Sequence, residues 1–189
     1  QQNIYGPLGM QTTGYRPLDR FPTERIAPTE CDNFYRKQQL IGYVHDETAC
    51  FFGGVQGNAG LFSNANDLAK LCQMWLNKGT YGNERILSPK TVELFLTEKS
   101  STSRRGLGFD KPDMENPEKS PTAIEASAST IGHLGFTGTC FWIDPEQELI
   151  YIFLCNRVYP SRTHGALSQL NIRPELFSTI YRSIKNHSK

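Results

Sequence analysis

The feature that most constrains this fold is the apolar run at residues 149–155, Leu-Ile-Tyr-Ile-Phe-Leu-Cys. The run has the length of a strand and falls far short of the ~20 residues that a membrane-spanning helix needs. Apolar and polar residues do not alternate along it, so we expect a strand that is covered on both faces. A chain that buries such a strand needs further layers of structure on each side of a sheet.

The segments around this run predict the rest of a sheet and a covering helix. Strands are expected at about residues 130–136, 139–143 and 148–156, with the last two joined by the turn Asp144-Pro145-Glu146-Gln147. A helix is expected at about residues 172–185, with its apolar residues on one side: Leu176, Phe177, Ile180, Tyr181 and Ile184. Strands followed by a covering C-terminal helix predict an α/β (α+β) fold.

The first part of the chain predicts fewer regular elements. Residues 1–49 are rich in Gly and Pro, which favours irregular backbone with at most one short helix at about residues 32–40. The four glycines between residues 53 and 60 predict a compact loop or the floor of a cleft. The polar segment at residues 100–128 is expected to be a surface excursion.

Two helices are expected between these loops. The first is capped by Ser63 or Asn64 and stopped by Gly79, and its apolar residues form one buried stripe. The second is shorter and starts at the cap Ser88, with a proline in its first turn.

Composition excludes several classes of function. The 189 residues include 20 Lys+Arg and 19 Asp+Glu, for a formal net charge of +1. This balance argues against nucleic-acid binding, and the tightest basic cluster, Arg104-Arg105, is typical of a solvated loop. The five cysteines include no Cys-x-x-Cys pair, so we expect buried free thiols and neither a metal site nor a cofactor.

The residue with the strongest chemical interest is His133. It lies on a predicted strand between Gly132 and Gly135, and glycines there permit a ligand or another segment to approach the backbone. A histidine can transfer protons near neutral pH, although a single histidine on a strand is also a common structural residue. Both interpretations stay open on the sequence alone.

Around His133 the sequence resembles the serine β-lactamase-related hydrolases, a family that includes class C β-lactamases, penicillin-binding-protein-like esterases and D-aminopeptidases. Residues 132–145, Gly-His-Leu-Gly-Phe-Thr-Gly-Thr-Cys-Phe-Trp-Ile-Asp-Pro, are similar to the family's third active-site motif, Lys-Thr-Gly or His-x-Gly. Other segments agree in order: Pro-Leu-Gly-Met at residues 7–10, Gly-Leu-Phe-Ser at 60–63, Asp-Leu-Ala-Lys at 67–70, Leu-Ser-Pro at 87–89 and Phe-Leu-Cys-Asn-Arg at 153–157.

The resemblance implies roles for four residues. His133 would face the scissile group and stabilise charge or relay a proton, and the backbone N–H of Phe136 would be one oxyanion-hole donor. Gly135 would let the substrate lie along the strand, and His45 is a weaker candidate at the rim of the cleft. The reaction implied is acyl transfer to water from an amide, ester or peptide-like substrate, through a serine acyl-enzyme.

The sequence departs from the family pattern at three points that bear on the implied acyl-transfer reaction. No serine lies three residues before any lysine, so the family's Ser-x-x-Lys nucleophile is absent from these 189 residues. The second motif, Tyr-x-Asn or Tyr-Ser-x, is also missing, because Tyr81-Gly82-Asn83 falls in a turn between two predicted helices. Leu134 stands where the family usually has a hydroxyl residue that recognises a substrate carboxylate.

The sequence therefore predicts the C-terminal part of such a hydrolase, as a single incomplete domain with a partial β-lactamase/transpeptidase-like fold. Residues 1–128 would supply part of the helical lobe and active-site loops, and residues 129–189 the antiparallel strands and closing helix. A missing N-terminal segment or self-association would complete the sheet. The alternatives are a non-catalytic binding or assembly lobe and an accessory domain of a multidomain cell-wall glycoside hydrolase. The resemblance implies a bacterial protein and a periplasmic or extracytoplasmic location.

Overall fold

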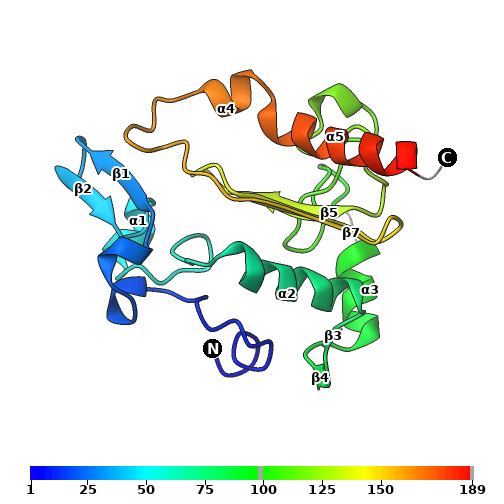
Figure 1. Cartoon of the computed structure of the whole chain (residues 1–189), viewed down its shortest axis with the longest axis horizontal. Coiled ribbons are helices and arrows are strands. Elements are labelled where there is room, and N and C mark those ends of the chain that lie inside the picture. Colours follow the sequence, from blue (N-terminus) through cyan, green and yellow to red (C-terminus); the bar gives the residue numbers. More distant parts are fainter. Residues whose placement is uncertain (98–99, 188–189) are drawn as a thin grey trace.

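A computed structural model describes residues 1–97 and 100–187 and shows a sheet held between two helices (Figure 1). The sheet is antiparallel with strand order β5-β6-β7. Helix α5 lies over one face and helix α2 lies under the other. These central elements are β5 (Ile131–Leu134), β6 (Cys140–Asp144), β7 (Leu149–Phe153), α2 (Ala65–Leu76) and α5 (Ile172–His187). The structure thus has the layers that the buried strand required.

Shorter elements surround this centre. A hairpin lies at the far left of Figure 1 beside a short helix, and a second small hairpin and a helix lie at the lower right. They are β1 (Pro28–Asp32), β2 (Gln38–Ile41), α1 (Glu47–Phe51), β3 (Thr80–Tyr81), β4 (Glu84–Arg85) and α3 (Pro89–Thr97). Helix α4 (Ala166–Gln169) precedes α5, and three 3₁₀ turns occur at Pro17–Asp19, Thr23–Arg25 and Pro117–Lys119.

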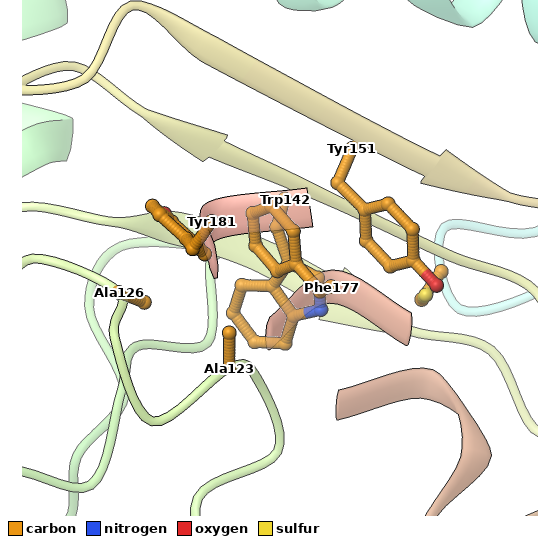
Figure 2. Close-up of a cluster of buried hydrophobic side chains, with 7 residues drawn as sticks. Ala123, Ala126, Trp142, Tyr151, Phe177 and Tyr181 are labelled. Carbon is orange, nitrogen blue, oxygen red and sulfur yellow. The ribbon is translucent and has the colours of Figure 1, made fainter. Parts of the chain in front are cut away.

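The apolar core under α5 is built from aromatic rings (Figure 2). The ring of Phe177 stacks on Tyr151 with a centroid separation of 4.5 Å, and it contacts Tyr181 at 4.7 Å. Trp142 is buried beside them, and three small residues complete the cluster: Cys140 from the same strand, β6, and Ala123 and Ala126 from the segment before β5. We call these seven residues the aromatic cluster. They hold α5 against the sheet, because fully buried aromatic side chains dominate core energetics.

The expected apolar side of α5 is only partly buried. Phe177 and Tyr181 enter the aromatic cluster, but Leu176, Ile180 and Ile184 are 37–44% exposed. The prediction of one shared face was therefore wrong for these three residues. A flat sheet contacts only a narrow stripe of a helix, and the residues at the sides of that stripe remain open to solvent.

The opposite face of the sheet packs on α2, which confirms that the apolar strand is covered on both sides. Ile150 and Ile152 of β7 join a cluster with Cys72 of α2, whereas Tyr151 points to α5. Helix α2 begins as expected, since the Asn64 side chain accepts a hydrogen bond from Asp67 N–H at 2.9 Å. It is followed by Gly79 with φ of +94°, where a Cβ would collide with the Leu87 carbonyl.

The short helix expected at residues 32–40 is wrong, because this segment forms the β1–β2 hairpin. The Asp32 carboxylate accepts hydrogen bonds from three successive backbone N–H groups, those of residues 34, 35 and 36. This reverses the chain after β1, and Lys37 with φ of +55° completes the turn. An Asx-type turn of this kind competes directly with helix formation.

The segment at residues 100–128 is not simply a surface excursion. Asp110, Lys111, Thr122 and Ala123 are buried, because the segment packs along the edge strand β5 and under α5. Backbone hydrogen bonds in both directions between Asp110 and Gly132 form an isolated β-bridge. The polar composition concealed this contact, because buried polar groups can be satisfied by backbone pairing.

Candidate active site

Strand β5 positions His133 through a close fit to its neighbour β6. A Cβ at Gly132 would collide with the Phe141 carbonyl and the Trp142 ring, so glycine is needed there for the strands to approach. Side chains alternate along a strand, so His133 shares the α2 face of the sheet with Ile131. His133 is half-buried at the open edge of that face.

The His133 ring is held by two hydrogen bonds. Its Nδ1 lies 2.8 Å from the Leu134 carbonyl, and its Nε2 lies 3.0 Å from Nη1 of Arg105. A carbonyl only accepts and a guanidinium only donates, so Nδ1 carries the proton and Nε2 is the acceptor. The two contacts therefore fix the orientation of the His133 ring beside a cationic side chain.

The turn after β5 presents Phe136 to solvent. Gly135 N–H donates to the Thr139 carbonyl at 2.7 Å, and the space where a Gly135 Cβ would lie is filled by the Thr139 side chain. The Phe136 side chain is 61% exposed, and its N–H meets no acceptor among residues 1–97 and 100–187. Arg157 secures the turn, because its Nε donates to the Phe136 carbonyl at 2.8 Å and its guanidinium lies 4.5 Å from the centre of the ring.

The structure brings His45 to this turn from a distant part of the sequence. The rings of His45 and Phe136 lie with centroids 5.1 Å apart. His45 is 9% exposed, so it lies inside the wall of the site and not at an open rim. Three of the four residues singled out from the sequence thus lie on one turn and its preceding strand, and the fourth packs against them.

A group of charged residues supports His45 from behind. Arg162 donates to both oxygens of Glu30, at 2.7 and 2.8 Å, and to Glu47 at 2.8 Å. His45 Nε2 lies 3.0 Å from Glu30 Oε2, outside hydrogen-bonding geometry. We call Glu30, His45, Glu47 and Arg162 the polar clamp. It joins β1, the start of α1 and the loop after β7, which meet at the left of Figure 1.

Electrostatics within the polar clamp favour ionised carboxylates and a neutral imidazole. The hydrogen bond from Arg162 lowers the pKa of Glu30 below its ordinary value. Burial lowers the pKa of His45, and it outweighs the opposing effect of the nearby Glu30 carboxylate. The positive charge of Arg36 also lowers the pKa of His45, and hydrogen bonds from Arg36 to the carbonyls of Val44 and His45, at 2.6 and 2.7 Å, hold that charge nearby.

Comparison with known protein families identifies the fold that carries this site. The family model described as Beta-lactamase matches residues 1–172. The chain belongs to the beta-lactamase family. Its mixed helices and antiparallel sheet are those of a partial β-lactamase/transpeptidase-like fold.

Curated relatives of this beta-lactamase family chain are longer proteins. It is 35% identical over 192 residues to a protein of Escherichia coli (strain K12) named "Putative D-alanyl-D-alanine carboxypeptidase", covering 95% of this chain and 43% of that protein. A protein of the same name from Salmonella newport (strain SL254) is 36% identical, over 94% of this chain and 42% of its own length. The chain thus spans less than half the length of these relatives.

A solved structure supports the same fold. A mutant of simvastatin synthase from Aspergillus terreus superposes with a TM-score of 0.60 and 16% sequence identity, covering 98% of this chain and 49% of that one. A second mutant of that enzyme has a TM-score of 0.53 and 18% identity, covering 82% of this chain and 44% of that one. At these identities the likeness concerns the fold.

Sequence reasoning missed the arginines that organise the site. Arg105 contacts His133, so the prediction that Arg104-Arg105 is only a solvated pair was wrong. Arg157, the last residue of the family-like segment 153–157, acts on Phe136, and Arg162 acts on the polar clamp; the sequence predicted neither contact. Their partners lie between 21 and 132 positions away, and no local pattern encodes pairings over such separations.

The described residues contain no group of three His, Cys, Asp or Glu side chains that could hold a metal ion. All five cysteines are free thiols, and burial raises the pKa of Cys72 and of Cys140 to about 12. No described helix is both long enough and apolar enough to cross a membrane. A cavity of about 630 Å³ lies between the loop at residues 9–12 and α2, and its lining includes neither His133 nor Phe136.

Proposed function

We propose that the protein containing this chain hydrolyses a peptide-like amide bond through a serine acyl-enzyme, with peptides ending in D-alanyl-D-alanine as its substrate class. The observation that carries the proposal is the 35–36% identity, over almost the whole chain, to proteins named as D-alanyl-D-alanine carboxypeptidases. The N–H of Phe136 supports it, because this group has no acceptor among the described residues and lies on the turn that follows the strand carrying His133, and acyl transfer needs a donor for the developing oxyanion.

Each singled-out residue has a distinct part in the proposed reaction. The N–H of Phe136 stabilises the oxyanion, and Gly135 keeps the turn narrow so that the substrate can lie beside it. His45 buttresses the Phe136 ring from inside the wall. His133 faces the substrate from the strand that precedes the turn. If it relays a proton, which requires Arg105 to release Nε2, removing it should slow acylation by about 10²-fold.

The nucleophile in this proposal lies outside the 189 residues. None of the lysines here has a serine three positions before it, so in this proposal the Ser-x-x-Lys of the family is supplied by a segment outside these 189 residues. The chemistry proposed for the residues present needs neither a metal nor an organic cofactor, since a serine, its lysine and backbone donors suffice for acyl transfer.

The decisive assay uses the full protein that contains this chain and measures release of D-alanine from N-acetyl-D-alanyl-D-alanine. Labelling by a fluorescent penicillin reports the acyl-enzyme directly. We expect His133→Ala to reduce the rate of acylation, while His164→Ala, at an exposed position, leaves it unchanged. Absence of both D-alanine release and penicillin labelling in the full protein would refute the proposal.

A second candidate function is a non-catalytic binding or assembly lobe, which the absent Ser-x-x-Lys favours. Both this candidate and the hydrolase proposal predict that residues 1–189 alone do not hydrolyse a chromogenic β-lactam or a short-chain ester. The two differ for the full protein, which releases no D-alanine if this candidate is right. Turnover by this chain that disappears in His133→Ala would contradict it, because chemistry would then reside in the chain itself.

We also propose a partner for the sheet. Among the described residues β7 pairs with β6 alone, so its other edge is open to a further strand. An apolar edge strand of this kind invites pairing with another segment. A retained N-terminal fragment or a second copy of the chain would supply it. Light scattering after size-exclusion chromatography tests this, and a stable monomer of 21.4 kDa without a second polypeptide would contradict it.

A further inference from the structure

An arginine that no family motif accounts for lies directly beside His133. The segment that carries it is fixed to the sheet by the bridge between Asp110 and Gly132. Asp110 is 2% exposed and accepts a hydrogen bond from Arg104 Nη2 at 2.9 Å, while Arg104 Nε lies 2.8 Å from its other oxygen, outside hydrogen-bonding geometry. This anchor places the next residue, Arg105, against the imidazole of His133 at the open edge of β5.

The Arg105 guanidinium is held in place but retains free hydrogen-bonding capacity. It donates to His133 Nε2 at 3.0 Å and lies 3.7 Å from Asp110 Oδ2, while its side chain remains 54% exposed. A guanidinium has five N–H donors in a planar fork, and these contacts use only part of them. The remaining donors are open to a ligand on the solvent side.

The charge of this group also favours an anion. Arg104 and Arg105 bring two positive charges, and Asp110 brings one negative charge. One positive charge therefore remains at the edge of the site. A fixed guanidinium matches a carboxylate in geometry as well as in charge.

We propose that Arg105 binds the terminal carboxylate of the peptide substrate and that His133 is the positioning residue that aims it. This rests on the proposed function and adds the determinant of its specificity. It also accounts for Leu134, whose aliphatic side chain packs against the aromatic cluster and has no hydroxyl with which to bind a carboxylate. The cation supplied by the loop replaces that donor.

The test compares two peptides that differ only at the carboxyl end: N-acetyl-D-alanyl-D-alanine and its C-terminal carboxamide. Dissociation constants are measured on the full protein by NMR titration at low ionic strength. We expect the native protein to bind the carboxylate at least about tenfold more tightly, the typical worth of a charge-assisted hydrogen bond. Arg105→Gln should abolish this preference, and Arg105→Lys should restore part of it.

The matched control is Arg182→Gln, which removes the same charge from a 57% exposed side chain on α5. It should keep the full preference for the carboxylate. The positioning role of His133 predicts that His133→Ala weakens the preference when Arg105 is present and changes nothing in the Arg105→Gln protein. A purely structural role would lower both affinities equally in both backgrounds.

Equal affinity for the two peptides, binding of neither, or a preference that survives Arg105→Gln would overturn the proposal. The readout is separate from that of the proposed function. Release of D-alanine with no preference between carboxylate and carboxamide would keep the hydrolase and eliminate the role of Arg105. Arg105-dependent carboxylate binding without any D-alanine release would keep the role of Arg105 and eliminate the hydrolase.

Discussion

The aromatic cluster and the polar clamp hold opposite ends of this molecule together by different physics. Under α5, Tyr151 and Phe177 stack at 4.5 Å in a fully buried core. At the other end, Arg162 ties two carboxylates from separate elements, and the contacts are charged and partly accessible. The aromatic cluster provides stability through apolar burial, and the polar clamp provides orientation through directional bonds.

This difference bears on the proposed function, because the proposed site lies at the polar end. His45 connects the polar clamp to Phe136, while Arg105 and Asp110 connect the other side of the site to β5. Directional contacts fix atoms relative to one another more sharply than apolar packing does. We therefore expect changes in the aromatic cluster to unfold the chain and changes in the polar clamp to misplace the site.

The largest effect is expected from Phe177→Ala in the aromatic cluster. The side chain is fully buried between two aromatic rings, so its loss should lower the free energy of unfolding by about 3–5 kcal/mol. The adjacent Leu176→Ala is the control, because that side chain is 44% exposed and should cost less than about 1 kcal/mol. Denaturant titration measures both, and equal losses would show that α5 is not held by this contact.

A smaller but local effect is expected from Glu30→Gln in the polar clamp. This change removes the charge of the nearly buried carboxylate that binds the Arg162 guanidinium through both oxygens, and it leaves Glu47 as the remaining charged partner of Arg162 in the polar clamp. It should cost about 2–3 kcal/mol, less than the loss of a fully buried pair, because Arg162 is partly exposed. Hydrogen exchange should accelerate in β1, β2 and the loop after β7 but not in α5.

The matched control for Glu30→Gln is Asp19→Asn, which breaks the exposed pair Arg16–Asp19 and should change stability by less than about 1 kcal/mol. Exchange that accelerates equally in α5 and in the hairpin would contradict the separation of the two regions, since it would mean that they unfold together.

The sequence predicted the aromatic end better than the polar end. The two helices α2 and α5 and the three strands of the sheet follow from local periodicity and from turn residues, with ends within about three residues. The β1–β2 hairpin does not, because the Asp32 carboxylate determines that turn through bonds that composition does not reveal. His133, Gly135 and Phe136 came from one continuous segment. The arginines around them depend on tertiary contacts and were missed.

One residue of the aromatic cluster, Tyr181, also makes a buried hydrogen bond, which tests whether apolar packing is what mainly holds α5 to the sheet. Tyr181 donates its hydroxyl to Asp144 at 2.5 Å, and Asp144 also accepts from the Ser127 N–H and hydroxyl. Because these other donors remain, Tyr181→Phe should cost only about 1 kcal/mol in thermal or chemical unfolding. A loss as large as that of Phe177→Ala would mean that this hydrogen bond, more than ring stacking, holds α5.

The smallest effect is expected from mild acidification, and it should appear only at the polar end. Burial lowers the pKa of His45, with Arg162 and Arg36 acting in the same direction and Glu30 and Glu47 opposing it. The neutral imidazole is thus favoured on folding, and this contribution is complete above the unfolded pKa of about 6.5. This stabilising contribution is lost as the pH falls from about 6.5 through the lower pKa that His45 has in the folded state. The carboxylates of the polar clamp, whose pKa values lie below their ordinary range, remain ionised at pH 5.

Between pH 7 and 5 hydrogen exchange, corrected for its intrinsic pH dependence, should therefore accelerate in β1, β2 and the Phe136 turn while α5 stays protected. His45→Asn removes the titrating group and should flatten the response. A response that persists in the His45→Asn protein would show that a different group titrates. It would also contradict the role of His45 in supporting the Phe136 turn.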